Sequence, residues 1–119
     1  MKKIVFAIAL MMASTLGAFA EDNSVNKVEA YALNINNRSL SRALSLSLDQ
    51  EEICSDVIKE FENDMLFAAS NSSNESRKAV TKNAVDKNLR YMKMFLSEKQ
   101  YKKYVMLLNA TLTNRGIKF

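Results

Sequence analysis

The sequence predicts an all-α protein, an antiparallel helical hairpin enlarged to a small bundle of about four helices. Apolar residues recur at helical spacing along three long stretches after residue 47. Gly116 is the only glycine after Gly17, and the chain has no proline. The chain therefore has few of the residues that tight β-turns favour. The pattern Leu-Ser-x-x-Gln occurs at residues 46–50 and again at 96–100. Its Ser-x-x-Gln spacing is that of a capping box, which starts a helix.

Residues 1–20 have the pattern of a cleaved signal peptide. Lys2 and Lys3 precede an apolar run at 4–16, and Ala18-Phe19-Ala20 supplies the small residues that a signal peptidase reads. The alternative is a transmembrane anchor, but the run is shorter than the about 20 apolar residues that a spanning helix needs. We therefore expect no membrane span after cleavage. A leader that begins Met-Lys-Lys is typical of bacteria, which predicts a periplasmic or secreted protein.

Residues 21–36 are expected to form a flexible or extended N-terminal arm. The larger apolar groups alternate over 31–35, as in an extended segment, whereas Val25, Val28, Ala32 and Ile35 also fit a helical stripe. The extended interpretation is preferred. Residues 37–119 should then form a single helical domain that begins with a short helix over 37–45. Asn36 or Asn37 caps that helix in this prediction.

Two long helices follow, over 48–69 and 75–95. Ser47 and Gln50 form the capping box of the first, and acidic residues in its first turn suit the helix dipole. The polar loop 70–74 precedes the second, with Ser72, Ser73 and Asn74 as alternative caps. Both helices carry apolar arcs too broad for contact with a single neighbour. Each is therefore expected to touch two neighbours, from the same chain or from a dimer mate.

A final helix is predicted over 98–114. Ser97 and Gln100 form its capping box. Gly116 fits the left-handed position that ends a helix, with Ile117 as the following apolar residue of a Schellman motif. We therefore interpret Ser47, Gln50, Ser97, Gln100 and Gly116 as structural caps.

Charge is divided along the chain. Residues 21–65 contain ten acidic and four basic side chains, whereas 66–119 contain three acidic and eleven basic side chains. One interpretation is that the acidic first long helix lies beside the basic helices that follow. The other is a basic surface left free for an acidic partner. The first is favoured, because solvated helix faces are usually charged.

The composition argues against an enzyme. Without histidine the chain lacks the usual general base and the commonest metal ligand. Cys54, the single cysteine, has no such base to activate it; it is interpreted as a buried apolar residue, with an intermolecular disulfide or a reactive thiol as alternatives. No catalytic residue, cofactor or metal is predicted. Nucleic-acid binding is disfavoured, because the tyrosines near Lys102 fall on an apolar stripe and the leader directs the chain out of the cytoplasm.

Binding of polypeptides through exposed side chains is the remaining possibility. Met94 falls outside the apolar arc of its helix, and Met106 lies on the side of the last helix that carries Lys99 and Lys103. Methionine adapts its shape to varied partners. These four residues are the candidate protein-binding site, although isolated exposed apolar residues also occur without any function.

The paired segments Leu46-Ser47-Leu48-Asp49-Gln50 and Leu96-Ser97-Glu98-Lys99-Gln100 resemble the LTxxQ motif of the Spy/CpxP family of small periplasmic proteins, with serine in place of threonine. The resemblance implies curved antiparallel helical dimers that hold unfolded proteins without ATP, or that act in envelope-stress signalling. The tail at 109–116 and the segment 101–104 are also similar to a group of uncharacterised small secreted bacterial proteins.

The expected function is therefore that of an ATP-independent, chaperone-like or envelope-stress binding protein. It would hold unfolded or partner polypeptides on an apolar and basic helical surface, with a homodimer as the arrangement that the resemblance implies. The alternative is a non-catalytic structural or regulatory module with one specific envelope partner.

Overall fold

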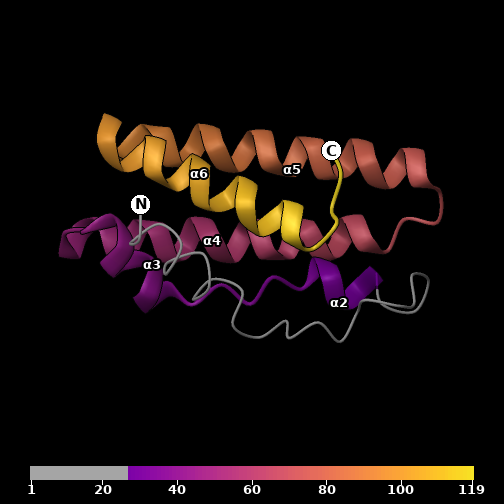
Figure 1. Ribbon diagram of the computed structural model, residues 1–119, viewed down its shortest axis with the longest axis horizontal. Coiled ribbons are helices and arrows are strands. Elements are labelled where there is room, and N and C mark those ends of the chain that lie inside the picture. The colour runs from indigo at the N-terminus through magenta and orange to yellow at the C-terminus, as the bar shows by residue number, and fades with distance from the viewer. Residues whose placement is uncertain (1–26) are drawn as a thin grey trace.

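The computed structural model describes residues 27–119, and the described residues form five helices with no strand (Figure 1). The predicted signal peptide and residues 21–26 lie outside the described residues. The helices are α2 (Lys27–Tyr31), α3 (Asn37–Leu44), α4 (Leu48–Ala69), α5 (Asn74–Phe95) and α6 (Glu98–Asn114). The all-α prediction is confirmed.

The helix ends fall where local capping chemistry places them. The predicted bounds 48–69 and 98–114 are those of α4 and α6. The third predicted helix begins one residue early, at Asn74, because Ser73 is its cap. Among the three alternative caps, the Ser73 Oγ accepts a hydrogen bond from the Ser76 N–H at 3.0 Å.

α4 and α5 form an antiparallel hairpin along the length of the molecule (Figure 1). Buried Arg77 holds the loop between them, since its guanidinium donates to the Asn71 carbonyl at 2.9 Å and to the Asn74 side chain. α4 also contacts α2 and α3, and α5 also contacts α6. The broad apolar arcs thus have more than one neighbour each, as predicted.

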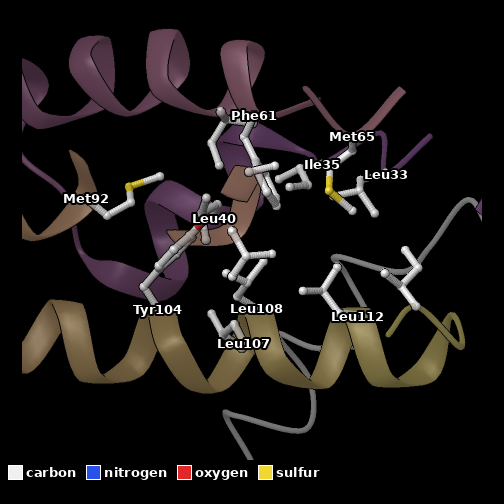
Figure 2. Packing of buried hydrophobic residues seen from close by; sticks show 14 of the residues in the cluster. Leu33, Ile35, Leu40, Phe61, Met65, Met92, Tyr104, Leu107, Leu108 and Leu112 are labelled. Carbon is white, nitrogen blue, oxygen red and sulfur yellow. The ribbon is translucent and has the colours of Figure 1, made fainter. Parts of the chain in front are cut away.

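α6 lies over one face of this hairpin and encloses the core (Figure 1). Its side chains Tyr104, Leu108 and Leu112 point towards apolar residues of α3 and α4 and of the segment before them (Figure 2). The largest fully buried side chains are Leu33, Leu40, Ile58, Phe61, Met65, Val85, Met92, Tyr104, Leu107, Leu108 and Leu112. The core therefore joins all parts of the described chain.

The described part of the N-terminal arm corrects the prediction of a flexible or extended segment. Residues 27–31 form the short helix α2, and only residues 32–36 are non-helical. Tyr31, Leu33 and Ile35 are buried in the core, so the arm is packed against α4. Both sequence patterns were partly correct, because a helical turn is followed by an extended stretch with alternate residues buried.

Candidate functional site

The two Leu-Ser-x-x-Gln segments each start a helix with a complete capping box. The Ser47 Oγ accepts from the Gln50 N–H at 3.2 Å, and the Gln50 Oε1 accepts from the Ser47 N–H at 3.0 Å. The same two bonds join Ser97 and Gln100, at 3.1 and 2.8 Å. Each box satisfies backbone donors that the first turn of a helix leaves unpaired. The prediction that these four residues are caps is confirmed.

The two glutamines also bind each other, which the sequence did not predict. The Gln50 Nε2 donates to the Gln100 Oε1 at 2.9 Å, and the Gln100 Nε2 donates to the Gln50 Oε1 at 3.1 Å. The Gln50 Nε2 also donates to the Phe95 carbonyl at 3.0 Å, and the Gln100 Nε2 to the Leu44 carbonyl at 3.2 Å and the Ser45 carbonyl at 3.3 Å. Gln50 thus caps the start of α4 and the end of α5, and Gln100 caps the start of α6 and the end of α3.

Arg115 connects the C-terminal end of α6 to the N-terminal arm. The side chain is 5% exposed. Its Nη1 donates to the carbonyls of Glu29, Ala30 and Ala32 at 3.3, 2.9 and 3.2 Å, and its Nη2 donates to the Leu33 carbonyl at 3.0 Å. These carbonyls lie at the end of α2, where a helix leaves acceptors unpaired. Burial lowers the pKa of the guanidinium.

The tail after α6 therefore has a structural role. Gly116 has a φ of +73°, in the left-handed region. The Gly116 N–H donates to the Thr113 carbonyl and the Ile117 N–H donates to the Leu112 carbonyl, both at 3.0 Å. These are the two bonds of the predicted Schellman motif, and the turn places Arg115 against α2.

Three of the four candidate binding residues share one stripe of α6. Lys99, Lys103 and Met106 follow one another at steps of four and three residues, so they lie on the same side of the helix. Met106 is 48% exposed, Lys99 is exposed and Lys103 is partly buried. The core residues Tyr104 and Leu108 are on the other side. The stripe therefore faces solvent.

Met94, the fourth candidate, is 78% exposed but lies on α5. Lys87, Tyr91 and Met94 form one stripe of α5. The Lys87 Nζ lies 2.8 Å from the Glu60 Oε2 and 2.9 Å from the Asp64 Oδ2, so that stripe borders α4. Met94 therefore lies on the stripe of α5 that borders α4 at Lys87, on a different helix from the other three candidates.

The favoured interpretation of the charge division is that the acidic first long helix lies beside the basic helices that follow. Within the described chain, ion pairs join oppositely charged helices at one place. Lys87 joins the basic α5 to two carboxylates of the acidic α4, and hydrogen bonding to Glu60, then to Asp64, raises its pKa. The other ion pair within residues 27–119 joins Lys82 and Asp86 of the same helix at 3.5 Å. Such exposed pairs contribute about 0–1 kcal/mol each. Most charged side chains of these helices thus face solvent.

Cys54 is buried, as its place on an apolar face predicted. Burial raises the pKa of its thiol to about 11. Tyr104, fully buried nearby, donates a hydrogen bond from its hydroxyl to the Asn88 Oδ1. Burial, with a smaller contribution from Cys54, also raises the pKa of Tyr104. A protonated thiol enclosed in the core is neither a nucleophile nor a partner for another chain.

The described residues thus define a small all-α protein with exposed methionine and lysine side chains. Within 27–119, no three His, Cys, Asp or Glu side chains are grouped to hold a metal ion. None of the helices in this range combines the length and the apolar character that a membrane crossing needs. Comparison of the chain with protein-family models, with curated proteins and with solved structures found no match.

Proposed function

We propose that this chain is a periplasmic or secreted polypeptide-binding protein that acts without ATP, as a chaperone-like or envelope-stress binder. The observation that supports this proposal best is the solvent-facing stripe of Lys99, Lys103 and Met106 on α6. The exposed Met94 adds a second contact point on α5. The location rests on the leader pattern of residues 1–20, and the activity on the resemblance of the two capping segments to the LTxxQ motif.

Such a surface binds through many weak contacts. Methionine is unbranched and polarizable, so Met106 adapts to different apolar side chains of an unfolded segment. The neighbouring ammonium groups attract acidic side chains and carbonyl oxygens, and they keep the surface soluble when it is empty. Binding of this kind needs no cofactor, because release follows from the weakness of each contact.

Suppression of aggregation tests the proposal. A chemically denatured client protein is diluted into buffer with an equal amount of this protein, and light scattering is followed. We expect reduced scattering, and a loss of most of that protection in the variant Lys103→Gln/Met106→Ser. The matched control Lys59→Gln/Leu66→Ser removes one lysine and one exposed apolar side chain from α4 and should protect like the wild type. No protection by the wild type would contradict the proposal.

A structural or regulatory module with one specific envelope partner is the second candidate. The placement of Met94 on a different helix from Lys99, Lys103 and Met106 favours it, because contact points on two helices suit one folded partner better than a variety of unfolded clients. Crosslinking followed by pulldown distinguishes the two. One dominant partner would favour the specific module, whereas a broad range of clients would favour the chaperone-like binder.

A further inference from the structure

The N-terminal half of α4 presents an exposed acidic surface with apolar residues in it. We call Leu48, Asp49, Glu51, Glu52, Ile53 and Asp56 the acidic surface; all six are exposed. Leu48 is 82% exposed and Ile53 44%. Within residues 27–119, none of the four carboxylates takes part in an ion pair. The helix dipole accounts for acidic residues in the first turn, but not for the exposed leucine.

This surface is also hollowed on one side. A groove of about 510 Å³ runs between α3 and α4 and contains part of the acidic surface. It is lined by Asn37, Arg38, Ser41, Leu48, Glu51, Glu52 and Ser55. Leu48 therefore borders an open space in which an apolar side chain of another molecule would find a contact, next to two carboxylates that suit a cation.

The opposite charge lies on α6. We call Lys99, Lys102, Lys103 and Met106 the lysine surface. None of its three ammonium groups takes part in an ion pair within the described chain. Like the acidic surface, it combines charges of one sign with an exposed apolar side chain, here Met106. The two surfaces are therefore complementary in charge and similar in apolar character.

The two surfaces form no ion pair with each other within residues 27–119. α4 and α6 pack on the same core from two sides, with Phe61 of α4 and Tyr104 and Leu108 of α6 turned towards each other (Figure 2). By helical spacing, the acidic surface lies on the side of α4 away from Phe61, and the lysine surface lies on the side of α6 away from Tyr104 and Leu108. A second molecule can bring surfaces of the two kinds together.

We propose that the acidic surface binds the lysine surface of a second copy of this chain. Met106 of one copy packs against Leu48 beside the groove of the other, while the ammonium groups face the carboxylates. Because the two surfaces differ and lie on the outer sides of different helices, the contact is heterologous, and each added copy leaves one surface of each kind free. The product is an open, growing assembly that depends on protein concentration and on salt, and it does not depend on the proposed binding of other polypeptides.

Sedimentation velocity tests the proposal on the full purified protein. At about 20 mM salt, where charges act over tens of ångströms, the average sedimentation coefficient should rise with protein concentration. At about 300 mM salt the association constant should fall at least ten-fold, because screening weakens contacts between exposed charges. A protein that stays monomeric at low salt up to millimolar concentration would overturn the proposal.

Charge reversal identifies the surfaces. Variant one carries Glu51→Lys and Glu52→Lys, and variant two carries Lys99→Glu and Lys103→Glu. Each alone should lose self-association, whereas an equal mixture should restore it. The unchanged lysine surface of variant one then fits the unchanged acidic surface of variant two, and the reversed acidic surface of variant one fits the reversed lysine surface of variant two. Circular dichroism verifies that both variants keep their helices.

The control reverses charges on α5, with Lys78→Glu and Arg90→Glu, and should associate like the wild type. Loss of association in this control would show an effect of net charge alone and overturn the proposal. A mixture that stays monomeric would do the same. Binding of a lysine- and leucine-containing peptide to the acidic surface, without self-association, would assign that surface to a different partner.

Discussion

Ser45 and Gly116 occupy equivalent positions after two helices, yet only one of them is glycine. Ser45 follows α3 with a φ of 57°, and Gly116 follows α6 with a φ of 73°. The Leu46 N–H donates to the Ser41 carbonyl at 3.0 Å, in the pattern that Ile117 makes with Leu112. A left-handed conformation costs an L-residue with a Cβ roughly 1–2 kcal/mol. Substitutions at the two positions should therefore change the stability of the protein in opposite directions.

We expect Ser45→Gly to stabilise the protein by about 1 kcal/mol, since it removes the strain of a Cβ at positive φ. Gly116→Ala should destabilise it by about 1 kcal/mol. A Cβ at Gly116 would meet no atom within 4 Å, so the cost is one of backbone conformation alone. Urea denaturation measures both changes. Equal effects of the same sign would contradict this account.

The thiol of Cys54 should be protected by the fold. Burial raises its pKa from the ordinary 9.0 to about 11, which leaves little thiolate at neutral pH. We expect the native protein to react with a disulfide reagent at pH 8 at least about 100-fold more slowly than the unfolded protein. Reaction at equal rates would show that the thiol reaches solvent.

The same burial gives a pH dependence of stability. Between pH 9 and about 11 the unfolded thiol loses its proton while the folded thiol keeps it, so the unfolded state is favoured as pH rises. Tyr104 acts in the same direction, because burial raises its pKa too. The melting temperature should thus fall over this range, and less so in Cys54→Ala, from which the thiol is absent. An identical fall in both proteins would exclude a contribution of Cys54.

At the scale of the helices, the paired glutamines join four helix ends. The amides of Gln50 and Gln100 bind each other, and each also binds a carbonyl at the end of α5 or α3. A glutamate in either position would still accept the bond of the capping box. It could not donate to the neighbouring helix. The requirement for glutamine thus comes from the contact between the motifs.

Gln100→Glu should therefore destabilise the protein by about 1–3 kcal/mol at neutral pH, because the carbonyls of Leu44 and Ser45 lose their donor and the carboxylate faces the Gln50 Oε1. Ser97→Ala, which removes only the cap, should cost about 1 kcal/mol. Thermal unfolding compares the two variants. If Gln100→Glu were as stable as the wild type, the amide contact would have no energetic role.

The helix bounds could be predicted because their causes are local. Ser47, Ser97 and Gly116 act on backbone groups within five residues of themselves. The contact between Gln50 and Gln100 spans 50 positions and depends on how the helices pack. The repeated motif and the choice of glutamine in both copies were the available signals, but neither indicates that the two side chains meet.

At the scale of the whole molecule, Arg115 holds the two ends of the described chain together. Its guanidinium donates hydrogen bonds to the carbonyls of Ala30 and Leu33, at the end of α2. The Ile35 N–H donates to the Glu62 carboxylate at 2.8 Å. The arm could not be predicted from its own sequence, because its conformation is fixed by residues far along the chain. For the same reason, the role of the tail could not be predicted from its own sequence.

Arg115→Ala should lower the free energy of unfolding by about 1–3 kcal/mol, since one buried and three partly buried carbonyls lose their donor at once. Lysine should not restore the loss, because one ammonium group cannot reproduce the fork of a guanidinium. Urea denaturation measures the loss, and hydrogen exchange should show reduced protection at Leu33 and Ile35. The control Lys118→Ala, at an exposed position of the same tail, should change neither. Unchanged protection of the arm in Arg115→Ala would contradict this role.

The contact of Arg115 also makes the native structure of the arm depend on a residue that follows it late in the chain. Leu33 precedes by 82 positions the arginine that donates to its carbonyl. Until that arginine is in place, α2 lacks its cap, and the apolar groups of the arm lack part of their cover. A nascent chain therefore cannot complete the native hydrogen bonds of the arm before Arg115 has been synthesised.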